Sequence, residues 1–296
     1  MNRRKKIDNN TKSTVKKNSV RDILMLKENG EKVVAITAYD YSTSVICDKA
    51  GVDIILVGDS AGMVMLGQRS TTPTLISEML VFCKGVSNGT RRAMVVGDLP
   101  FGSYQSSKEL AVDNAVKFIK SGCDAVKLEG GTELVGTIKA LVSAGIPVMG
   151  HLGLKPQTSF FWDRNKVQAK SKDSSIRLIA EAKALEQAGV FSIILEMVTS
   201  EVAHIISRSV TPVVIGIGSG PDCDGQVLVL HDALGLYEEI RPRFVKRYAN
   251  LSGIMFKAIS RYKYDVKCAN FPEDRNTFHM SSDEYLRLQE NGSEPR

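Results

Sequence analysis

The sequence predicts an α/β protein built as a (β/α)8 TIM barrel, and three observations lead to this prediction. Eight short apolar runs, rich in β-branched residues, recur from about residue 33 onward. Helix-like stretches such as 106–122 and 175–189 separate most of these runs, and apolar strands that alternate with helices are typical of a parallel sheet covered on both faces. Eight such strands within roughly 230 residues is the strand count of a (β/α)8 barrel.

The predicted strands follow one another along the chain. They are VVAITAY (33–39), IILVG (54–58), AMVVG (93–97), DAVKL (124–128), IPVMG (146–150), FSIILE (191–196), PVVIGIG (212–218) and QVLVL (226–230). Four of them come after a small residue and a glycine, at Gly51, Gly122, Gly145 and Gly189. Because glycine readily adopts the left-handed conformation that ends a helix, each of these steps is predicted to separate a helix from the next strand.

A doubly wound open sheet is the alternative architecture for this pattern. It would be favoured by the glycine fingerprint of dinucleotide-binding folds. The segment GIGSGPDCDG (216–225) spaces its first two glycines correctly, but Pro221 stands where the third is needed. The barrel is therefore the preferred prediction.

Composition indicates one large folded unit with polar ends. The chain has 296 residues, of which 43% are hydrophobic, enough for one barrel-sized core. We expect a basic, disordered tail over 1–18, the catalytic barrel over 19–280 and a C-terminal extension over 281–296. Residues 1–21 carry eight Lys or Arg and one Asp, so the net charge of +6 belongs to the tail. The nearly neutral remainder gives no reason to expect a nucleic-acid partner.

Cysteine usage and hydropathy predict a cytoplasmic protein without a membrane partner. Five scattered cysteines with no Cys-x-x-Cys pair are typical of free thiols in a reducing compartment. No apolar run approaches the roughly 18–20 residues that span a bilayer. The N-terminus also lacks the apolar region of a secretory signal.

Groups that can bind a metal or move a proton follow almost every predicted strand. In chain order they are Tyr39 and Asp40, Asp59, Asp98, Glu129, His151, Glu196, and His231 with Asp232. In a (β/α)8 barrel the C-terminal ends of the strands carry the active site. Lys127 and Glu129 lie on one face of their strand, because side chains alternate along a strand. We expect both to point into the barrel toward one polar site.

Asp59, Asp98 and Glu129 end three neighbouring strands and form the predicted metal site. Three hard oxygen ligands, with no cysteine or pair of histidines nearby, suit Mg²⁺ rather than Zn²⁺. Lys127 beside them would supply a fixed positive charge for an anionic substrate. Glu196, on the far side, ends an apolar strand, and partial burial would suit it to act as a general base. A chelated 2-keto acid with a base near C3 is an enolisation site, because a cation holds the charge of the enolate.

Seven blocks of the chain carry a resemblance to a known family. They are TAYDYSTSVICDKAGVDIILVGDSAGM, VVGDLPFGSY, AVKLEGG, PVMGHLGLKPQ, IILEMV, TPVVIGIGSG and DGQVLVLHDALG. Together they resemble ketopantoate hydroxymethyltransferases, in order, from about residue 20 to about residue 280. The blocks LVGDS, GDLPF and VKLEGG are specific to that family rather than common to barrels.

The resemblance implies a Mg²⁺-dependent (β/α)8 enzyme of pantothenate biosynthesis, the pathway to the coenzyme A precursor. Such an enzyme moves a hydroxymethyl group from 5,10-methylenetetrahydrofolate to 3-methyl-2-oxobutanoate by way of an enolate. The products are 2-dehydropantoate and tetrahydrofolate. The resemblance also implies a homo-oligomer, since members of the family commonly assemble as decamers.

The resemblance implies roles for individual residues at matching positions. Asp59 and Asp98 match aspartates that contact the metal and its bound substrate, and Glu129 matches a glutamate that reaches the metal directly or through water. Ser60 matches a contact of the substrate carboxylate, and Lys127 matches the lysine that binds the keto acid. The structural alternatives are a loop cap for each aspartate and a simple ion pair for Lys127 with Glu129.

Two further positions lie on the other side of the predicted site. The resemblance makes Glu196 the proton acceptor and places His151, within the GHLGL block, beside the substrate. The structural alternatives are a solvated strand end for Glu196 and an ordinary buried histidine for His151.

The chain departs from the family pattern after GHLGLKPQ. The family carries a glycine-rich segment there, whereas this chain has FFWDRNKVQAK over 160–170. Phe160, Phe161 and Trp162 are candidates to stack on a pterin, with lid or subunit packing as the alternative. Two other functions stay open: a lyase of the isocitrate lyase and phosphoenolpyruvate mutase type, although its Cys-Gly-His loop is missing, and a non-catalytic barrel.

Overall fold

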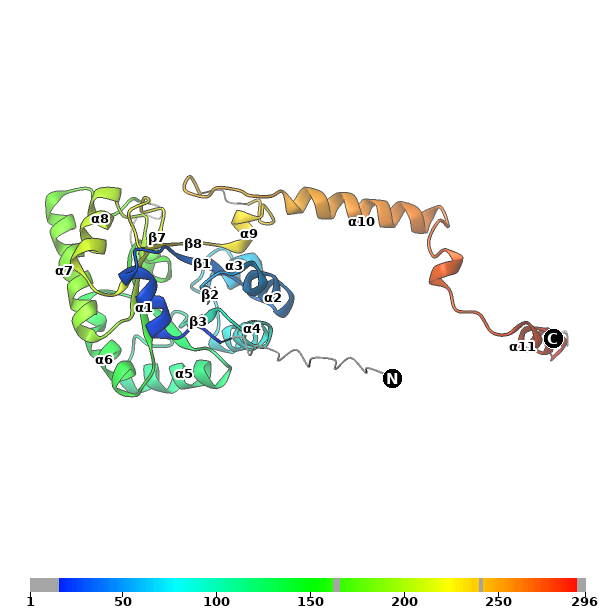
Figure 1. The fold of residues 1–296 in the computed structure, drawn as a ribbon, viewed down its shortest axis with the longest axis horizontal. Helices are drawn as coiled ribbons and strands as arrows, with labels where there is room; N and C mark the ends of the chain where they lie inside the picture. The colour runs from blue at the N-terminus through cyan, green and yellow to red at the C-terminus, as the bar shows by residue number, and fades with distance from the viewer. Residues whose placement is uncertain (1–15, 162–165, 240–241, 292–296) are drawn as a thin grey trace, which may run out of the picture.

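Eight parallel strands close into a barrel in the order of the chain, so the predicted fold class is confirmed (Figure 1). The computed structural model describes residues 16–161, 166–239 and 242–291. The strands are β1 (Val33–Thr37), β2 (Ile54–Val57), β3 (Met94–Asp98), β4 (Ala125–Glu129), β5 (Val148–Gly153), β6 (Ser192–Glu196), β7 (Val213–Ile217) and β8 (Gly225–Leu228). Each of the eight predicted runs overlaps one of them.

The described residues also form helices, most of which surround the strands, as Figure 1 shows. They are α1 (Val20–Glu28), α2 (Tyr41–Ala50), α3 (Ala61–Val64), α4 (Ile76–Gly89), α5 (Lys108–Lys120), α6 (Val135–Ser143), α7 (Lys172–Ala188), α8 (Ser200–Ser209), α9 (Leu230–Ala233), α10 (Leu251–Lys267) and α11 (Ser282–Asn291). Short 3-10 turns lie at Thr132–Leu134, Pro156–Phe161 and Asp274–Asn276. Gly51 and Gly189 end α2 and α7 with φ of 87° and 95°, which confirms the role predicted for them.

Two apolar layers hold the barrel together. The first lies inside it and consists of inward-facing strand residues, among them Met94, Val96 and Ala125, together with Ile23 of α1. The second lies between the strands and the helices and includes Val95, Val126 and Leu128. The alternation along β4 therefore assigns Ala125 to the interior layer, and Lys127 and Glu129 continue it on the same face.

The interior layer changes from apolar to polar toward the C-terminal end of the strands. On β3, the inward positions run from Met94 and Val96 to Asp98, and on β5 from Met149 to His151. All five strand-end groups of the predicted site, Asp59, Asp98, Glu129, His151 and Glu196, thus come to lie at one end of the barrel. This is the end at which barrels of this class carry their active sites.

The barrel's contacts begin slightly before the expected boundary at residue 19. Lys17 forms an ion pair with Asp124, with Nζ and Oδ2 2.6 Å apart, and the Asn18 side chain donates to the Asp53 carbonyl at 3.1 Å. These contacts tie residues 17 and 18 to the turns that precede β4 and β2. The prediction of a disordered tail also concerns residues 1–15, which lie outside the described residues.

The C-terminal helices leave the barrel rather than completing it. Leu251 and Ser252 still donate backbone hydrogen bonds to the carbonyls of Leu234 and Gly235, but α10 has no buried residue. Figure 1 shows α10 and α11 extending away from the strands. Within the described residues, the packed barrel therefore ends near residue 252, well before the expected boundary at 280.

Candidate active site

Strand register explains why the predicted charged groups meet. Asp98 on β3 is level with Lys127 on β4, and Glu129 on β4 is level with His151 on β5. Because all four side chains face inward, neighbours in register come within contact distance. Lys127 Nζ lies 2.7 Å from Asp98 Oδ2 and 3.4 Å from Glu129 Oε1, which confirms the expectation that Lys127 and Glu129 share one site.

Two aspartates face each other beside this lysine. The backbone N–H of Asp59 donates to Asp98 Oδ2 at 3.2 Å, and both side chains are buried. Burial and the charge of Asp98 raise the pKa of Asp59 well above its ordinary value. Burial also raises the pKa of Asp98, although Lys127 opposes this rise. Two such carboxylates are costly to ionise together, and a bound cation would relieve that cost.

Lys127 and Glu129 are both charged in this setting. Burial alone would lower the pKa of Lys127, but Asp98, Glu129 and Asp59 together raise it above its ordinary value. Burial opposes ionisation of Glu129, but Lys127 and His151 hold its pKa at about 2. The lysine therefore provides a permanent positive charge within the barrel mouth.

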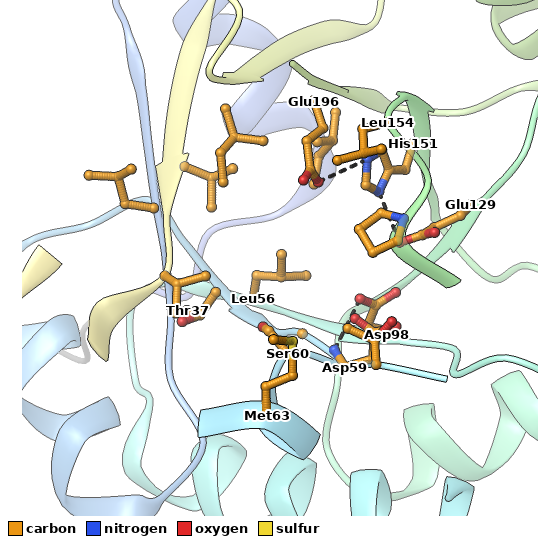
Figure 2. Close-up of a pocket in the computed structure, with 18 of the residues that line it drawn as sticks. Thr37, Leu56, Asp59, Ser60, Met63, Asp98, Glu129, His151, Leu154 and Glu196 are labelled. Carbon is orange, nitrogen blue, oxygen red and sulfur yellow. Dashed lines mark hydrogen bonds and ion pairs between the residues drawn. The ribbon is translucent and has the colours of Figure 1, made fainter. Parts of the chain in front are cut away.

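His151 lies between the two glutamates of the predicted site (Figure 2). Its Nδ1 is 3.3 Å from Glu129 Oε1 and its Nε2 is 3.4 Å from Glu196 Oε2. Burial disfavours the charged ring, but the negative charge of Glu129 outweighs it and raises the pKa of His151 to about 9. His151 thus lies within ionic-contact distance of both Glu129 and Glu196.

Glu196 occupies the side of the pocket opposite the aspartates. The side chain of Glu196 is 17% exposed, whereas those of Asp98 and Glu129 are each 1% exposed. It lines the same cavity as Asp59, Asp98 and Lys127. Figure 2 shows its carboxylate directed into that space. This position suits a group that exchanges protons with a bound molecule.

Ser60 follows Asp59 at the start of α3, and its hydroxyl lies 2.8 Å from the Tyr39 hydroxyl. Tyr39 is buried, so it holds the serine at the edge of the cavity that Ser60 lines. Asp40, by contrast, accepts a hydrogen bond from the Thr43 N–H and caps α2. Of the two residues that end the first strand, one supports the site and the other supports a helix.

The acidic pair fits a Mg²⁺ ion. Asp98 Oδ1 is buried and makes no hydrogen bond to any described residue, which leaves an acceptor oxygen for a cation. Mg²⁺ characteristically takes one or two carboxylates and fills its remaining positions with water or substrate oxygens. Among the described residues, no three His, Cys, Asp or Glu side chains are grouped to hold a metal. Glu129 is instead engaged by Lys127, His151 and the N–H of Gln157, so a direct metal bond from Glu129 stays a prediction.

Sequence reasoning missed Gln157, which organises this cluster. Its side-chain amide donates to Asp59 Oδ2 and to the Leu99 carbonyl, both at 2.9 Å. The Tyr104 hydroxyl donates to Gln157 Oε1 at 2.6 Å, which fixes the orientation of the amide. The Tyr104 hydroxyl also accepts from the Glu129 N–H at 3.1 Å. The resemblance block ending in LKPQ contained Gln157, but no local pattern indicated that it is buried.

Replacing Gln157 by Leu is expected to lower the free energy of unfolding by about 1–3 kcal/mol. The variant removes the amide that donates to Asp59 and to the Leu99 carbonyl, and unsatisfied buried groups carry that cost. Urea unfolding followed by circular dichroism measures it. Gln187→Leu on the exposed face of α7 is the matched control, with an expected change within about 0.5 kcal/mol. Equal stability of the two variants would contradict this role for Gln157.

The cavity extends well beyond the charged cluster. It has a volume of about 360 Å³. One wall carries the acidic pair, Lys127 and Glu129, and the opposite wall is largely apolar. The lining residues of that apolar side include Ile194, Ile217, Val227, Val229, Pro242 and Phe244. The side chains of the candidate stacking residues Phe160, Phe161 and Trp162 are not among those that the structure describes.

Sequence comparison groups the chain with one enzyme family. A family profile described as ketopantoate hydroxymethyltransferase matches residues 17–274. A 3-methyl-2-oxobutanoate hydroxymethyltransferase of Nitrosopumilus maritimus is 53% identical over 272 residues, covering 92% of this chain and 98% of its own. The protein of the same name from Moorella thermoacetica is 49% identical, covering 86% and 94%.

Structure comparison finds the same fold in more distant proteins. A phosphonopyruvate hydrolase complex with oxalate and Mg²⁺ matches with a TM-score of 0.58 at 12% identity, covering 93% of this chain and 98% of its own. A 2,3-dimethylmalate lyase of the phosphoenolpyruvate mutase and isocitrate lyase superfamily matches with a TM-score of 0.56 at 16% identity, covering 92% and 95%. At these identities the likeness concerns the fold alone.

Proposed function

Because the chain belongs to the ketopantoate hydroxymethyltransferase family, we propose that it uses 5,10-methylenetetrahydrofolate to hydroxymethylate 3-methyl-2-oxobutanoate. Water supplies the hydroxyl oxygen, the products are 2-dehydropantoate and tetrahydrofolate, and the reaction belongs to pantothenate biosynthesis. The observation that carries the proposal is one cavity with two chemically distinct sides. A buried acidic pair with a lysine lies on one side, and a partly exposed glutamate lies across from it.

The charged side suits the 2-keto acid. Asp59 and Asp98 would hold Mg²⁺, and Glu129 would reach it directly or through water. When bound there, Mg²⁺ would polarise the keto oxygen and stabilise the negative charge that develops on enolisation. Lys127 offsets the charge of the anionic substrate, and the Ser60 hydroxyl is placed at the cavity edge to donate to its carboxylate.

Glu196 is proposed to remove the proton from C3 of the bound keto acid. The pair of ionic contacts through His151 holds the Glu196 carboxylate at one place in the cavity. The charge of Glu129 outweighs the effect of burial and raises the pKa of His151 to about 9, which favours a ring that donates to both glutamates. A fixed, ionised carboxylate near the substrate carbon is the requirement for general-base catalysis.

The proposed function is tested with purified protein, 3-methyl-2-oxobutanoate, 5,10-methylenetetrahydrofolate and Mg²⁺, with and without EDTA. Formation of 2-dehydropantoate that stops with EDTA is the expected result. Cleavage of 2,3-dimethylmalate without hydroxymethyl transfer would instead indicate a lyase like the structural neighbour of that name. No turnover of either kind would indicate a non-catalytic barrel.

Asp98→Asn is expected to remove Mg²⁺ binding while leaving the fold intact. The substitution keeps the shape of the side chain but deletes the charge that a hard cation requires. Isothermal titration with Mg²⁺ and electron paramagnetic resonance with Mn²⁺ report metal binding apart from activity. Asp113→Asn, an exposed position on α5, removes the same charge and should bind metal like the wild type. Unaltered metal binding in Asp98→Asn would rule out this aspartate as a ligand.

The chain is also proposed to act as a homo-oligomer, with a decamer as the expected assembly. Helix α10 supports this proposal, because it is rich in apolar residues and none of its residues is buried. Its exposed apolar residues are Ile254, Met255, Phe256, Ile259, Tyr262, Tyr264 and Val266. Apolar surface of this extent is typical of subunit interfaces. On the barrel, Val34 of β1 is also 51% exposed, which adds apolar surface for a partner to cover.

Replacing Ile259 and Tyr262 by Asp should therefore reduce the assembly to smaller species. Sedimentation velocity measures the mass, and Lys257→Asp on the same helix is the control for added negative charge. A wild-type protein that sediments as a monomer at micromolar concentration would contradict the proposed oligomer.

Cysteine chemistry supports a cytoplasmic location. All five cysteines are free, and four of them are buried, as is typical of proteins in reducing compartments. Within the described residues, no helix combines the length and the apolar character that a membrane crossing requires.

A further inference from the structure

The part of the cavity beyond Glu196 has no role in holding the keto acid. The volume of about 360 Å³ falls within the range of about 300–1,000 Å³ typical of sites for drug-sized ligands. A five-carbon keto acid on Asp59, Asp98 and Lys127 occupies only the charged side. The space against β7, β8 and the following segment therefore remains for a second, larger molecule.

Asp232 is the one ionisable side chain on this second side, among the lining residues that the structure describes. It follows β8 on α9 and is partly buried. Burial raises its pKa to about 6, although Arg247 opposes the rise. No hydrogen bond or ion pair of its carboxylate is found among the described residues, whereas Arg247 donates to the Tyr237 carbonyl at 3.2 Å. A partly buried carboxylate that faces a cavity without a bonded partner is placed to bind a ligand.

The surroundings of Asp232 suit a flat ring. Phe244 and Pro242 line the same cavity as Asp232, and Ile217 and Val229 add apolar side chains to its lining. Phe244 also packs closely on Gly218, where a Cβ atom would lie 2.8 Å from the ring. The absence of a side chain at Gly218 thus lets the aromatic ring lie against the end of β7. Planar heterocycles gain contact energy on walls of this kind.

We propose that Asp232, with Phe244 and Pro242, forms the subsite for the pterin ring of the folate co-substrate, a proposal that rests on the proposed function. The reduced pterin presents an N3–H and a 2-amino group on one edge, and both are donors. A carboxylate accepts two such parallel hydrogen bonds at once. Asp232 binds this edge, and the apolar wall contacts the face of the ring.

This arrangement explains how two substrates share one cavity. The pterin lies on the β7–β8 side and the keto acid on the β2–β4 side, with Glu196 on β6 lining the same space. The one-carbon unit of the folate then reaches the keto acid without leaving the pocket. The remainder of the folate, a benzoyl glutamate, is left to extend toward solvent.

The test compares Asp232→Asn with the wild type in two separate measurements. Isothermal titration with tetrahydrofolate should show a dissociation constant raised about 10- to 100-fold, because a carboxylate that accepts two hydrogen bonds becomes an amide that accepts fewer. Exchange of the C3 proton of 3-methyl-2-oxobutanoate into D₂O, which uses Mg²⁺ but no folate, should change by less than about threefold. Asp222→Asn, exposed and paired with His204, is the matched control and should change neither.

Binding of two fragments of the folate provides a further test. Binding of 6-methyltetrahydropterin should weaken in Asp232→Asn, whereas binding of 4-aminobenzoyl glutamate should not. An unchanged affinity for tetrahydrofolate would overturn the proposal, and so would a loss of exchange equal to the loss of folate affinity. If the wild type exchanges the C3 proton but binds no folate, both the pterin subsite and the assignment of folate as co-substrate are wrong. If the wild type neither exchanges nor binds, the proposed function itself is wrong.

Discussion

Glu196→Gln is expected to bind 3-methyl-2-oxobutanoate with Mg²⁺ and yet to exchange its C3 proton about 10² to 10⁴ times more slowly than the wild type. This range is the usual contribution of a positioned general base. Glutamine keeps the shape of the side chain but cannot accept the proton. The groups proposed to hold the substrate, Asp59, Asp98 and Lys127, line the same cavity and are unchanged.

Nuclear magnetic resonance in D₂O without folate measures the exchange directly. The wild type should exchange only when Mg²⁺ is present, and Glu196→Gln hardly at all. Glu201→Gln, on α8 at an exposed position, serves as the control for an equal loss of charge. Exchange at the wild-type rate together with failed product formation would assign Glu196 to the folate half of the reaction. Exchange and turnover that both stay normal would show that Glu196 is structural.

The barrel and most of its charged cluster follow from the sequence for identifiable reasons. Apolar runs separated by helical segments leave few alternatives to a parallel barrel once eight of them are present. Period-two alternation placed Lys127 and Glu129 on one face, and consecutive strands in a barrel are neighbours. The shared side of Lys127 and Glu129 follows from this alternation, whereas the contact of Lys127 with Asp98 also depends on the register that places the two residues level.

Other features depended on loops, which carry no such periodicity. Gln157 lies in a turn after β5 that folds over the barrel mouth, so its contact with Asp59 joins residues far apart in the sequence. The alternation of side chains along a strand also left the roles of Tyr39 and Asp40 undecided. An aspartate that follows a strand can either point into the barrel or cap the next helix. The side chain of Asp40 proved to cap α2.

The C-terminal boundary shows a different limit of sequence patterns. The family resemblance runs to about residue 280, and the expected barrel domain has the same end. Such a resemblance shows that α10 belongs to the family pattern, but it does not show what the helix packs against. In the described residues α10 has no buried residue, so its place beside the barrel could not be predicted from the sequence.

Lys127→Met is expected to lower the free energy of unfolding of the metal-free protein by about 3–5 kcal/mol. The substitution keeps much of the aliphatic volume but removes the charge between Asp98 and Glu129, which are 1% exposed. Breaking a buried ion pair by deleting one partner carries this cost, because the other partner is left buried and uncompensated. Lys120→Met, exposed on α5, is the control and should change stability by less than about 0.5 kcal/mol.

The pH dependence of this loss has a definite sign. Lys127 and His151 lower the pKa of Glu129 from 4.5 to about 2. The stability gained from that shift is present above pH 4.5 and is lost as the pH falls toward 2. The difference between Lys127→Met and the wild type should therefore be largest near neutral pH and should narrow as the pH is lowered below about 4.5.

Two further measurements connect this stability to the metal. Mg²⁺ should stabilise Lys127→Met more than the wild type, because a bound cation replaces the missing charge and binds only the folded state. Adding Asp98→Asn to Lys127→Met should restore part of the stability, since it removes one of the uncompensated carboxylates. Urea unfolding at several Mg²⁺ concentrations tests both. If Lys127→Met is as stable as the wild type without Mg²⁺, the lysine does not compensate the buried acids, and the electrostatic basis of the metal site is wrong.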